Sequence, residues 1–298
     1  MKRTDVSFSS EGNILKGWLY HPDAVSGDAP AIVLTHGFTG VKEQYIDKYA
    51  EFFASAGFYA LAYDHANFGE SEGTPRQELD PVLQRRGYRD AITFLLSLPG
   101  IDKNGIGIWG SSISGGHVIE VAAIDRRVKC VVAQVPQISG YESSLRRLRS
   151  DLVPAMLDRF QADRQAQFEG AAPAMMPAVS DDPSTACAMV GADSYKFFMD
   201  TASFAPNWKN EVTLRSLELF RENEPGRFIS RISPTPLLMI VGDSDALTAT
   251  DICLKAYEEA LEPKKLVMIK GGHFTPYIEN FEVTSNAARN WFAQHLMG

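Results

Sequence analysis

Short, continuously apolar runs recur along this chain and restrict its fold more than any other feature. AIVLTHG at 31–37 has no alternating polar positions, as expected of a strand that is buried on both faces of a sheet. Between such runs lie segments with helical spacing of apolar residues, such as 44–57. Strands that alternate with helices predict a mostly parallel sheet with helices on both faces. The further strands expected on this pattern cover residues 58–65, 105–110, 128–136, 236–245 and 264–273.

Local signals add a hairpin and the helix ends. DVSFSS and ILKGWLYHP alternate polar and apolar residues on either side of the turn at 11–13, which predicts an N-terminal β-hairpin. Gly57 and Pro99 follow amphipathic segments, as glycine and proline commonly do at helix ends. The helices expected on these signals cover residues 44–57, 80–98, 115–124 and 285–296.

The alternation of strands and helices stops after the strand at 128–136. Helical stretches at 141–160 and 210–223 follow, separated by a segment rich in alanine, proline and methionine, and no buried strand is expected there. In open parallel sheets the ligand crevice lies at the carboxyl ends of the strands, so an insertion at this point would cover it as a lid. The domains expected are an α/β core over 1–139 and 234–298 and a helical cap over 140–233.

The composition argues against several classes of protein. A formal net charge of −8 without a long basic run is not typical of a nucleic-acid-binding protein, and RR at 85–86 and RRLR at 146–149 are expected to be solvated. Cys130, Cys187 and Cys253 lie far apart, which disfavours a disulfide framework and a metal site. No apolar run approaches about 18 residues, and none follows the basic N-terminus as in a signal peptide. We expect a cytoplasmic protein without a metal or organic cofactor.

The stretch GIGIWGSSISGGH at 105–117 places serines where an expected strand turns into an expected helix. A nucleophilic serine at such an elbow needs small residues two positions before and after it, because the turn leaves no room for side chains. Ser112 meets this requirement between Gly110 and Ser114, and Ser114 meets it between Ser112 and Gly116. We favour Ser112, because the strand GIGIW ends just before the serines and Ser112 then lies at the turn.

Two later strand ends carry partners for such a serine. A serine nucleophile needs a base, and the base needs a carboxylate that fixes its tautomer. Asp243 and Asp245 lie at the end of the strand in IVGDSD, and His273 follows the next strand in KGGHF. Serine, aspartate and histidine therefore occur in this chain order, each just past the carboxyl end of an expected strand.

These motifs resemble those of α/β-hydrolases. The resemblance covers nearly the whole chain and includes THGFTGVKEQY, YDHANFGESEG, IGIWGSSISGG, PTPLLMIVGDSDALT and GGHF. Within that superfamily the chain is similar to the dienelactone-hydrolase-like and X-Pro-peptidase-like branch. It is more closely similar to the group of YcjY-type hydrolases and fungal polyketide transferases or thiohydrolases.

The resemblance implies the roles of the side chains. Ser112 matches the nucleophile and His273 the base of a catalytic triad. Asp245 matches the acid in the G-x-x-D turn, with Asp243 as the alternative. Ser114 replaces the second glycine that usually flanks the elbow, which is a departure from the family pattern.

The resemblance also implies backbone and structural groups. The N–H groups of Phe38 and Ile113 match the oxyanion hole. His36 is implied to brace the oxyanion loop, and His65 and His117 are expected to be structural. The aromatic segment at 193–208 and the methionines at 175–176 are left with two interpretations, as the lining of an apolar pocket or as packing of the cap on the core.

These features together predict a serine hydrolase that cleaves an ester or thioester through an acyl-enzyme. The rival is an acyltransferase that passes the acyl group to an alcohol, as the resemblance to polyketide transferases implies. An amide or C–C bond hydrolase and a non-catalytic binding protein of the same fold are further alternatives. The partner expected is a small-molecule acyl substrate, with a carrier-bound thioester and a homodimer left open, and neither nucleic acid nor membrane insertion is expected.

Overall fold

Parallel pairing dominates the sheet of this protein. The computed structural model describes residues 2–23 and 27–298. In these residues the main sheet has eight strands in the order β1-β2-β4-β3-β5-β6-β9-β10, with β1 and β2 antiparallel and the others parallel to one another. The prediction of a mostly parallel α/β sheet is confirmed. The strands are β1 (Lys2–Ser10), β2 (Asn13–His21), β3 (Ala29–Thr35), β4 (Tyr59–Tyr63), β5 (Ile101–Ser111), β6 (Val128–Gln134), β9 (Leu237–Gly242) and β10 (Lys264–Ile269).

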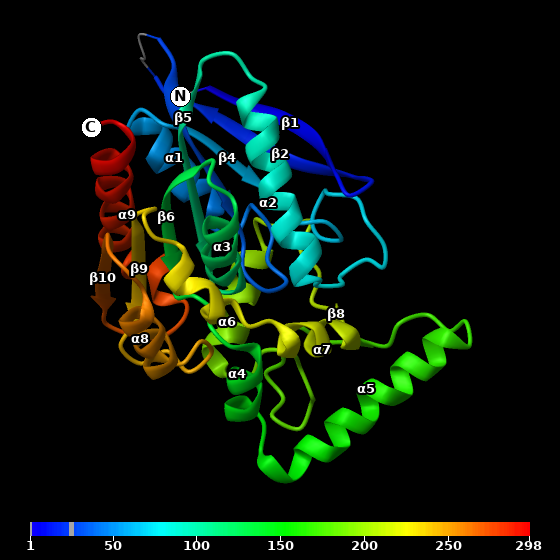
Figure 1. Cartoon of the computed structure of the whole chain (residues 1–298). Coiled ribbons are helices and arrows are strands. Elements are labelled where there is room, and N and C mark those ends of the chain that lie inside the picture. Colours follow the sequence, from blue (N-terminus) through cyan, green and yellow to red (C-terminus); the bar gives the residue numbers. More distant parts are fainter. Residues whose placement is uncertain (1, 24–26) are drawn as a thin grey trace.

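Helices cover both faces of this sheet (Figure 1), which explains why its central strands are apolar throughout. On one face, Phe53 of α1 and Phe292 of α9 share a core with the strands. On the other face, Ile92 of α2, Val118 of α3 and Ile252 of α8 share the second core. These helices are α1 (Ile46–Ser55), α2 (Pro81–Leu96), α3 (Ile113–Ile124), α8 (Thr250–Glu259) and α9 (Phe281–Leu296).

Local signals set where several elements begin. The Asp80 side chain caps α2 by accepting from the N–H groups of Val82 and Leu83, and Pro81 occupies the first turn. Helix α3 begins at Ile113, two residues before the expected start, because the elbow turn is complete at Ser112. Helix α8 was not predicted, although a crossover between the parallel strands β9 and β10 requires a connection of this kind.

The chain between β6 and β9, which was predicted to form a cap, is not wholly helical. The expected helix over 141–160 is interrupted after Arg147, where Leu148 takes an extended backbone. Two short strands pair antiparallel, which the sequence did not predict. The elements of this segment are α4 (Gly140–Arg147), η1 (Ser150–Leu152), α5 (Val153–Phe168), β7 (Met175–Met176), α6 (Ala192–Ala202), β8 (Val212–Thr213), α7 (Leu214–Glu222) and η2 (Pro225–Arg231).

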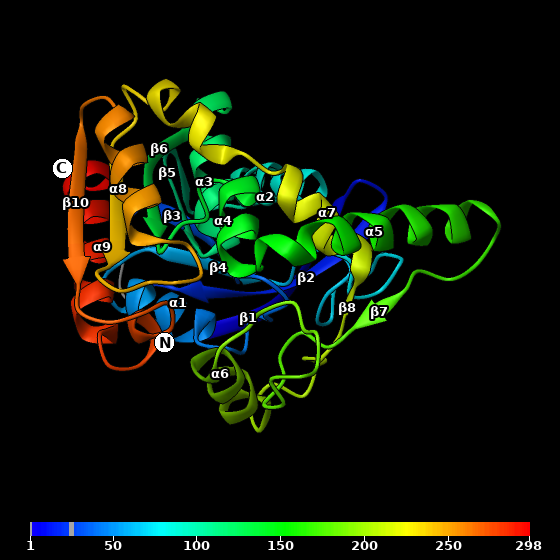
Figure 2. The same ribbon diagram turned by 90° about the horizontal axis from the view of Figure 1, so that it is seen from below.

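Helix α5 projects from the body of the molecule, whereas α6 folds back toward α1 (Figure 2). The side-chain amide of Gln44, just before α1, donates to Thr201 Oγ1 of α6 at 2.7 Å. This bond ties the segment to the carboxyl edge of the sheet, since Gln44 follows β3. In the described part of the chain, no helix combines the length and apolar character needed to cross a bilayer.

Candidate active site

Ser112 stands at the sharp turn between β5 and α3. Its backbone angles, φ 60° and ψ −122°, lie in a region that residues other than glycine rarely adopt. A Cβ at Gly110 would overlap the carbonyl oxygen of Ser114, so no side chain fits two positions before the serine. The structure therefore forms the strained elbow that the small residues predicted.

His273 links Ser112 to Asp245. Its Nε2 lies 2.9 Å from Ser112 Oγ, and its Nδ1 lies 2.7 Å from Asp245 Oδ2. Ser112 lies past β5, Asp245 past β9 and His273 past β10, so the three meet at the carboxyl edge of the sheet. His273 and Asp245 are buried, and Ser112 is partly exposed.

Asp245 is held ionised by its surroundings. Its carboxylate accepts from the N–H groups of Leu247 and Thr248 at 2.8 and 3.0 Å, and from the Thr248 hydroxyl at 2.8 Å. Burial alone would raise the pKa of Asp245, but the charge of His273 and the hydrogen bonds lower it to about 2. A carboxylate of this kind fixes the imidazole with its proton on Nδ1, which leaves Nε2 free to accept from the serine.

The structure separates the two aspartates that the sequence left as alternatives. Asp243 accepts from the N–H of Gly271 at 2.8 Å, in the loop after β10. Asp243 thus holds the loop that carries His273, whereas Asp245 contacts the imidazole itself.

The structure also separates the two serines. Ser114 is fully buried, donates its hydroxyl proton to the carbonyl of His36 and lies 2.9 Å from His65 Nε2. Because that proton is already donated, His65 Nε2–H is the donor to Ser114. Ser114, which departs from the usual glycine, connects the elbow helix to the loop after β3.

The buried histidines form a neutral structural group. His36 Nε2 accepts from the His65 N–H at 3.2 Å, and its Nδ1 donates to the Gly37 carbonyl at 2.9 Å. His117 Nε2 lies 2.8 Å from Gln84 Oε1. Burial lowers the pKa of His36 to about 4 and lowers the pKa values of His65 and His117 well below their ordinary value. These side chains brace the site without contacting Ser112 Oγ.

Two backbone amides next to Ser112 are available to bind an oxyanion. A Cβ at Gly37 would lie 2.9 Å from the Cβ of Ser112, so glycine lets the loop after β3 approach the serine. Among the described residues, neither the N–H of Phe38 in that loop nor the N–H of Ile113 has a hydrogen-bond acceptor. Free amide donors of this kind are what an oxyanion hole requires.

A buried lysine fixes the same loop, and the sequence analysis missed it. Lys42 is fully buried, with its Nζ 2.7 Å from Asp64 Oδ2 and 2.6 Å from Glu70 Oε2. Its backbone N–H also donates to Asp64 Oδ1 at 2.8 Å. Burial disfavours the charge, but the carboxylate of Asp64 and that of Glu70 together raise the pKa of Lys42. The signal was available, because Lys42 and Asp64 follow the neighbouring strands β3 and β4 in the sequence.

The space directly beside Ser112 is small, and several aromatic rings line it. It measures about 30 Å³, little more than a water molecule occupies. Phe197 and Phe198 line it, and they also stack on Phe274 and Trp208 at centroid distances of 4.5 and 5.2 Å. Both interpretations of the aromatic segment therefore apply to these rings. Met176 instead lines a separate cavity inside the cap.

The arginines expected to be solvated are divided between surface and interior. Arg146 forms an exposed ion pair with Asp251, but Arg147 turns inward over the ring of Phe220. Arg85 is mostly buried and its Nε lies 2.9 Å from Glu120 Oε1. The prediction of solvation is wrong for Arg147 and Arg85. Within the described residues, no cluster of histidine, cysteine and acidic side chains is placed to hold a metal ion.

Comparison with known proteins identifies the family and supports the fold. The sequence profile of the X-Pro dipeptidyl-peptidase (S15) family matches residues 11–275. A thiohydrolase of Eupenicillium brefeldianum is 33% identical over 91% of this chain and 87% of its own, and the polyketide transferase claH of Penicillium crustosum is 29% identical over 89% and 87%. The crystal structure of the α/β hydrolase GrgF from Penicillium sp. sh18 superimposes over 100% of both chains with a TM-score of 0.85 and 26% identity.

The match to the family covers most of the chain, the relatives share most of its length, and the solved structure shares its fold. The protein is thus an enzyme of the α/β-hydrolase type, a hydrolase or an acyltransferase. The chain belongs to the X-Pro dipeptidyl-peptidase (S15) family.

Proposed function

We propose that the protein is a serine hydrolase that cleaves a thioester or carboxylic ester through an acyl group on Ser112. The observation that carries the proposal is the unbroken chain of hydrogen bonds from Ser112 through His273 to Asp245, set beside two free backbone amides. Nucleophile, base, orienting carboxylate and oxyanion donors are the groups that acyl transfer requires.

The first half of the reaction forms the acyl-enzyme. Ser112 Oγ attacks the substrate carbonyl while His273 Nε2 takes the hydroxyl proton, and the carbonyl oxygen becomes an oxyanion held by the amides of Phe38 and Ile113. The tetrahedral intermediate collapses as the bond to sulfur or oxygen breaks. His273 then gives its proton to the leaving thiolate or alkoxide, which departs as a thiol or alcohol.

The second half restores the enzyme. Water gives a proton to His273 Nε2 and attacks the acyl carbonyl, the same amides hold the second oxyanion, and the bond to Ser112 Oγ breaks as His273 returns the proton. The product is a carboxylic acid. Asp245 remains a carboxylate throughout and stabilises the imidazolium that forms in each half.

The relatives support a thioester as the substrate. The similar protein from Eupenicillium brefeldianum is named a thiohydrolase, and it matches this chain over most of the length of both. We propose on this ground that the substrate is a small-molecule acyl compound delivered as a thioester, with a carrier as its source.

A second candidate function, transfer of the acyl group to an alcohol, is favoured by a specific observation. The space beside Ser112 is small and lined by Phe197, Phe198 and Phe274, so an acyl group that enters would displace water. The similar protein of Penicillium crustosum is named a polyketide transferase. An alcohol that reaches the acyl-enzyme would then compete with water as the acceptor.

The proposal is tested by labelling and turnover of the same protein samples. A fluorophosphonate should add once to the wild type and to Ser114→Ala, and should not add to Ser112→Ala, as read by intact mass. Hydrolysis of p-nitrophenyl and thioester substrates should follow the same pattern. Labelling of Ser112→Ala would place the nucleophile elsewhere, and product analysis with added alcohol separates ester formation from hydrolysis.

A further inference from the structure

The cap contains a second, larger cavity whose chemistry points to a ligand. It has a volume of about 290 Å³, near the lower end of the range of about 300–1,000 Å³ typical of small-molecule sites. Its walls come from α4, η1, α5, β7, α7 and the loop before α6, and most of the side chains that form them are apolar. No acidic side chain lines it, but three arginines do, namely Arg147, Arg159 and Arg221.

Two of these arginines face the cavity with unused hydrogen-bond donors. Arg147 has one hydrogen bond, from Nε to the carbonyl of Ser143 at 3.1 Å, and its guanidinium lies 4.8 Å from the centre of the Phe220 ring. Arg221 Nη1 is buried without a hydrogen-bond partner, and that guanidinium lies over the ring of Tyr141. Neither arginine forms an ion pair with any of the described residues.

An unpaired charge in such a place is costly, since burial lowers the pKa of Arg147 to about 10 and no carboxylate contacts it. This contrasts with Lys42, a fully buried cation that has two carboxylates within 2.7 Å. In a chain with a net charge of −8, carboxylates are not scarce. The charge of Asp245 favours the cationic form of Arg147, but the two form no ion pair, so an anion that enters the cavity would supply the direct contact that Arg147 lacks.

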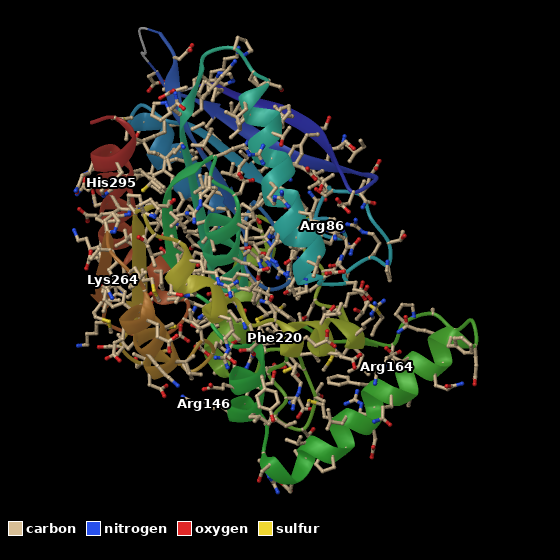
Figure 3. The ribbon with its side chains drawn as sticks, viewed as in Figure 1. Arg86, Arg146, Arg164, Phe220, Lys264 and His295 are labelled. Carbon is tan, nitrogen blue, oxygen red and sulfur yellow. The ribbon has the colours of Figure 1, made fainter. Side chains whose placement is uncertain are left out.

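The cavity adjoins the space around Ser112. The ring of Phe220 lines the cavity and packs edge-on against Phe38, which lines the space beside the serine, at 5.8 Å between centroids. Figure 3 shows Phe220 where α7 meets the core. The loop before α6 also serves both spaces, with Ala188 and Val190 in the cavity and Met189 beside Ser112. One ligand could therefore reach from the cavity to the serine by displacing Phe220.

We propose that this cavity binds the non-reacting end of the substrate, an apolar chain that carries an anionic group, with the anion held between Arg147 and Arg221. The proposal rests on the acyl-transfer function and specifies its substrate class. The anion is either a carboxylate on the acyl chain or a phosphate on the leaving group of a carrier thioester. Apolar walls bind the chain, and the guanidinium groups, which fit both anions, supply selectivity.

Calorimetric titration of the whole protein with octanoate, octyl phosphate and octan-1-ol tests the proposal without any need for turnover. Octanoate or octyl phosphate should bind at least about tenfold more tightly than octan-1-ol, as a charge-assisted contact predicts. Tighter binding of octyl phosphate would assign the anion to the leaving group, and tighter binding of octanoate would assign it to the acyl chain. Equal affinity for all three would overturn the proposal.

Two variants assign the effect to the cavity. Arg147→Met should remove the preference for the charged ligand, and Arg147→Lys should retain part of it. Arg146→Met, which removes the neighbouring surface arginine, is the matched control and should keep the full preference. Equal losses in Arg147→Met and Arg146→Met would contradict the proposal. If thermal unfolding shows that Arg147→Met is not folded, Arg221→Met replaces it and should likewise remove the preference for the charged ligand.

A kinetic measurement connects the cavity to the reaction. Octanoate should inhibit hydrolysis of p-nitrophenyl butyrate competitively in the wild type, and at least about tenfold more weakly in Arg147→Met. Inhibition that is not competitive would show that the cavity is no part of the substrate site. A different outcome is that octanoate binds tightly but the fluorophosphonate does not label Ser112. That outcome would overturn the proposed function and leave the proposed anion site intact.

Discussion

The Cβ position of Gly37 lies 2.9 Å from the Cβ of Ser112, so the loop that presents the Phe38 amide is in direct contact with the elbow that presents the serine. The two halves of the candidate site are thereby held at a fixed separation. Any side chain on residue 37 must push the loop and the serine apart.

Gly37→Ala should therefore reduce kcat strongly. We expect a loss of about 100-fold or more, as for removal of one oxyanion donor, with a smaller change in KM. Steady-state hydrolysis of a p-nitrophenyl ester measures it. Gly272→Ala is the control, because the nearest atom to a Cβ there is 3.7 Å away. Equal effects of the two variants would show that crowding at Ser112 is not the cause.

Asp245→Asn should reduce kcat by about 10⁴-fold, because an amide at this position favours the wrong tautomer of His273. Asp243→Asn is the matched variant. Its amide oxygen can still accept from the Gly271 N–H, so we expect kcat to remain within a few-fold of the wild type. Similar losses in the two variants would reassign the orienting acid.

Lys42→Met should destabilise the protein by about 3–5 kcal/mol, because it leaves the buried carboxylate of Asp64 without its cation. Urea unfolding at pH 7 measures the change. The double variant Lys42→Met/Asp64→Asn should recover part of this loss, since the unpaired charge is then removed. Lys196→Met, which breaks an exposed pair with Asp200, should cost less than about 0.5 kcal/mol. If Lys42→Met also costs less than about 0.5 kcal/mol, the buried pair of Lys42 and Asp64 does not stabilise the fold as proposed here.

The buried histidines should make the protein sensitive to acid. Their pKa values are lower in the folded chain than the ordinary 6.5, so below pH 6.5 the unfolded chain binds more protons. The contribution of these histidines to stability should be constant above that pH, decline as the pH falls through 6.5 and level off below their folded pKa values. For His36, whose pKa is about 4, the full loss is about 3 kcal/mol.

Replacement of one of these histidines provides the test. His117→Gln keeps a donor toward Gln84 and cannot be protonated, so its unfolding midpoint in urea should change less between pH 7.5 and pH 5 than that of the wild type. Identical pH dependence in the two proteins would show that His117 is already protonated in the folded state, or that its surroundings do not exclude the charge.

The parts of the fold that the sequence predicted are those set by local pattern. The central strands β3, β4, β6 and β9 appear as apolar runs because both faces of each are buried, and Ser112 is marked by small neighbours that its turn requires. Asp245 and His273 were predicted because each follows the end of an expected strand. The parallel strands bring these ends to one edge of the sheet.

The parts that the sequence did not predict depend on contacts between distant segments. Arg146 and Arg147 are adjacent in a basic run, but neighbours on a helix point about 100° apart, so one reaches Asp251 and the other enters the cap cavity. The break between α4 and α5 and the pairing of β7 with β8 likewise depend on how the cap segment packs on itself.

The small space beside Ser112 bears on how the acyl-enzyme would choose its acceptor. At about 30 Å³ it cannot store a pool of either water or alcohol next to the serine. Each acceptor would have to arrive from the solvent that reaches the partly exposed serine. The ratio of hydrolysis to transfer would then reflect how often each acceptor arrives, and it should vary with alcohol concentration.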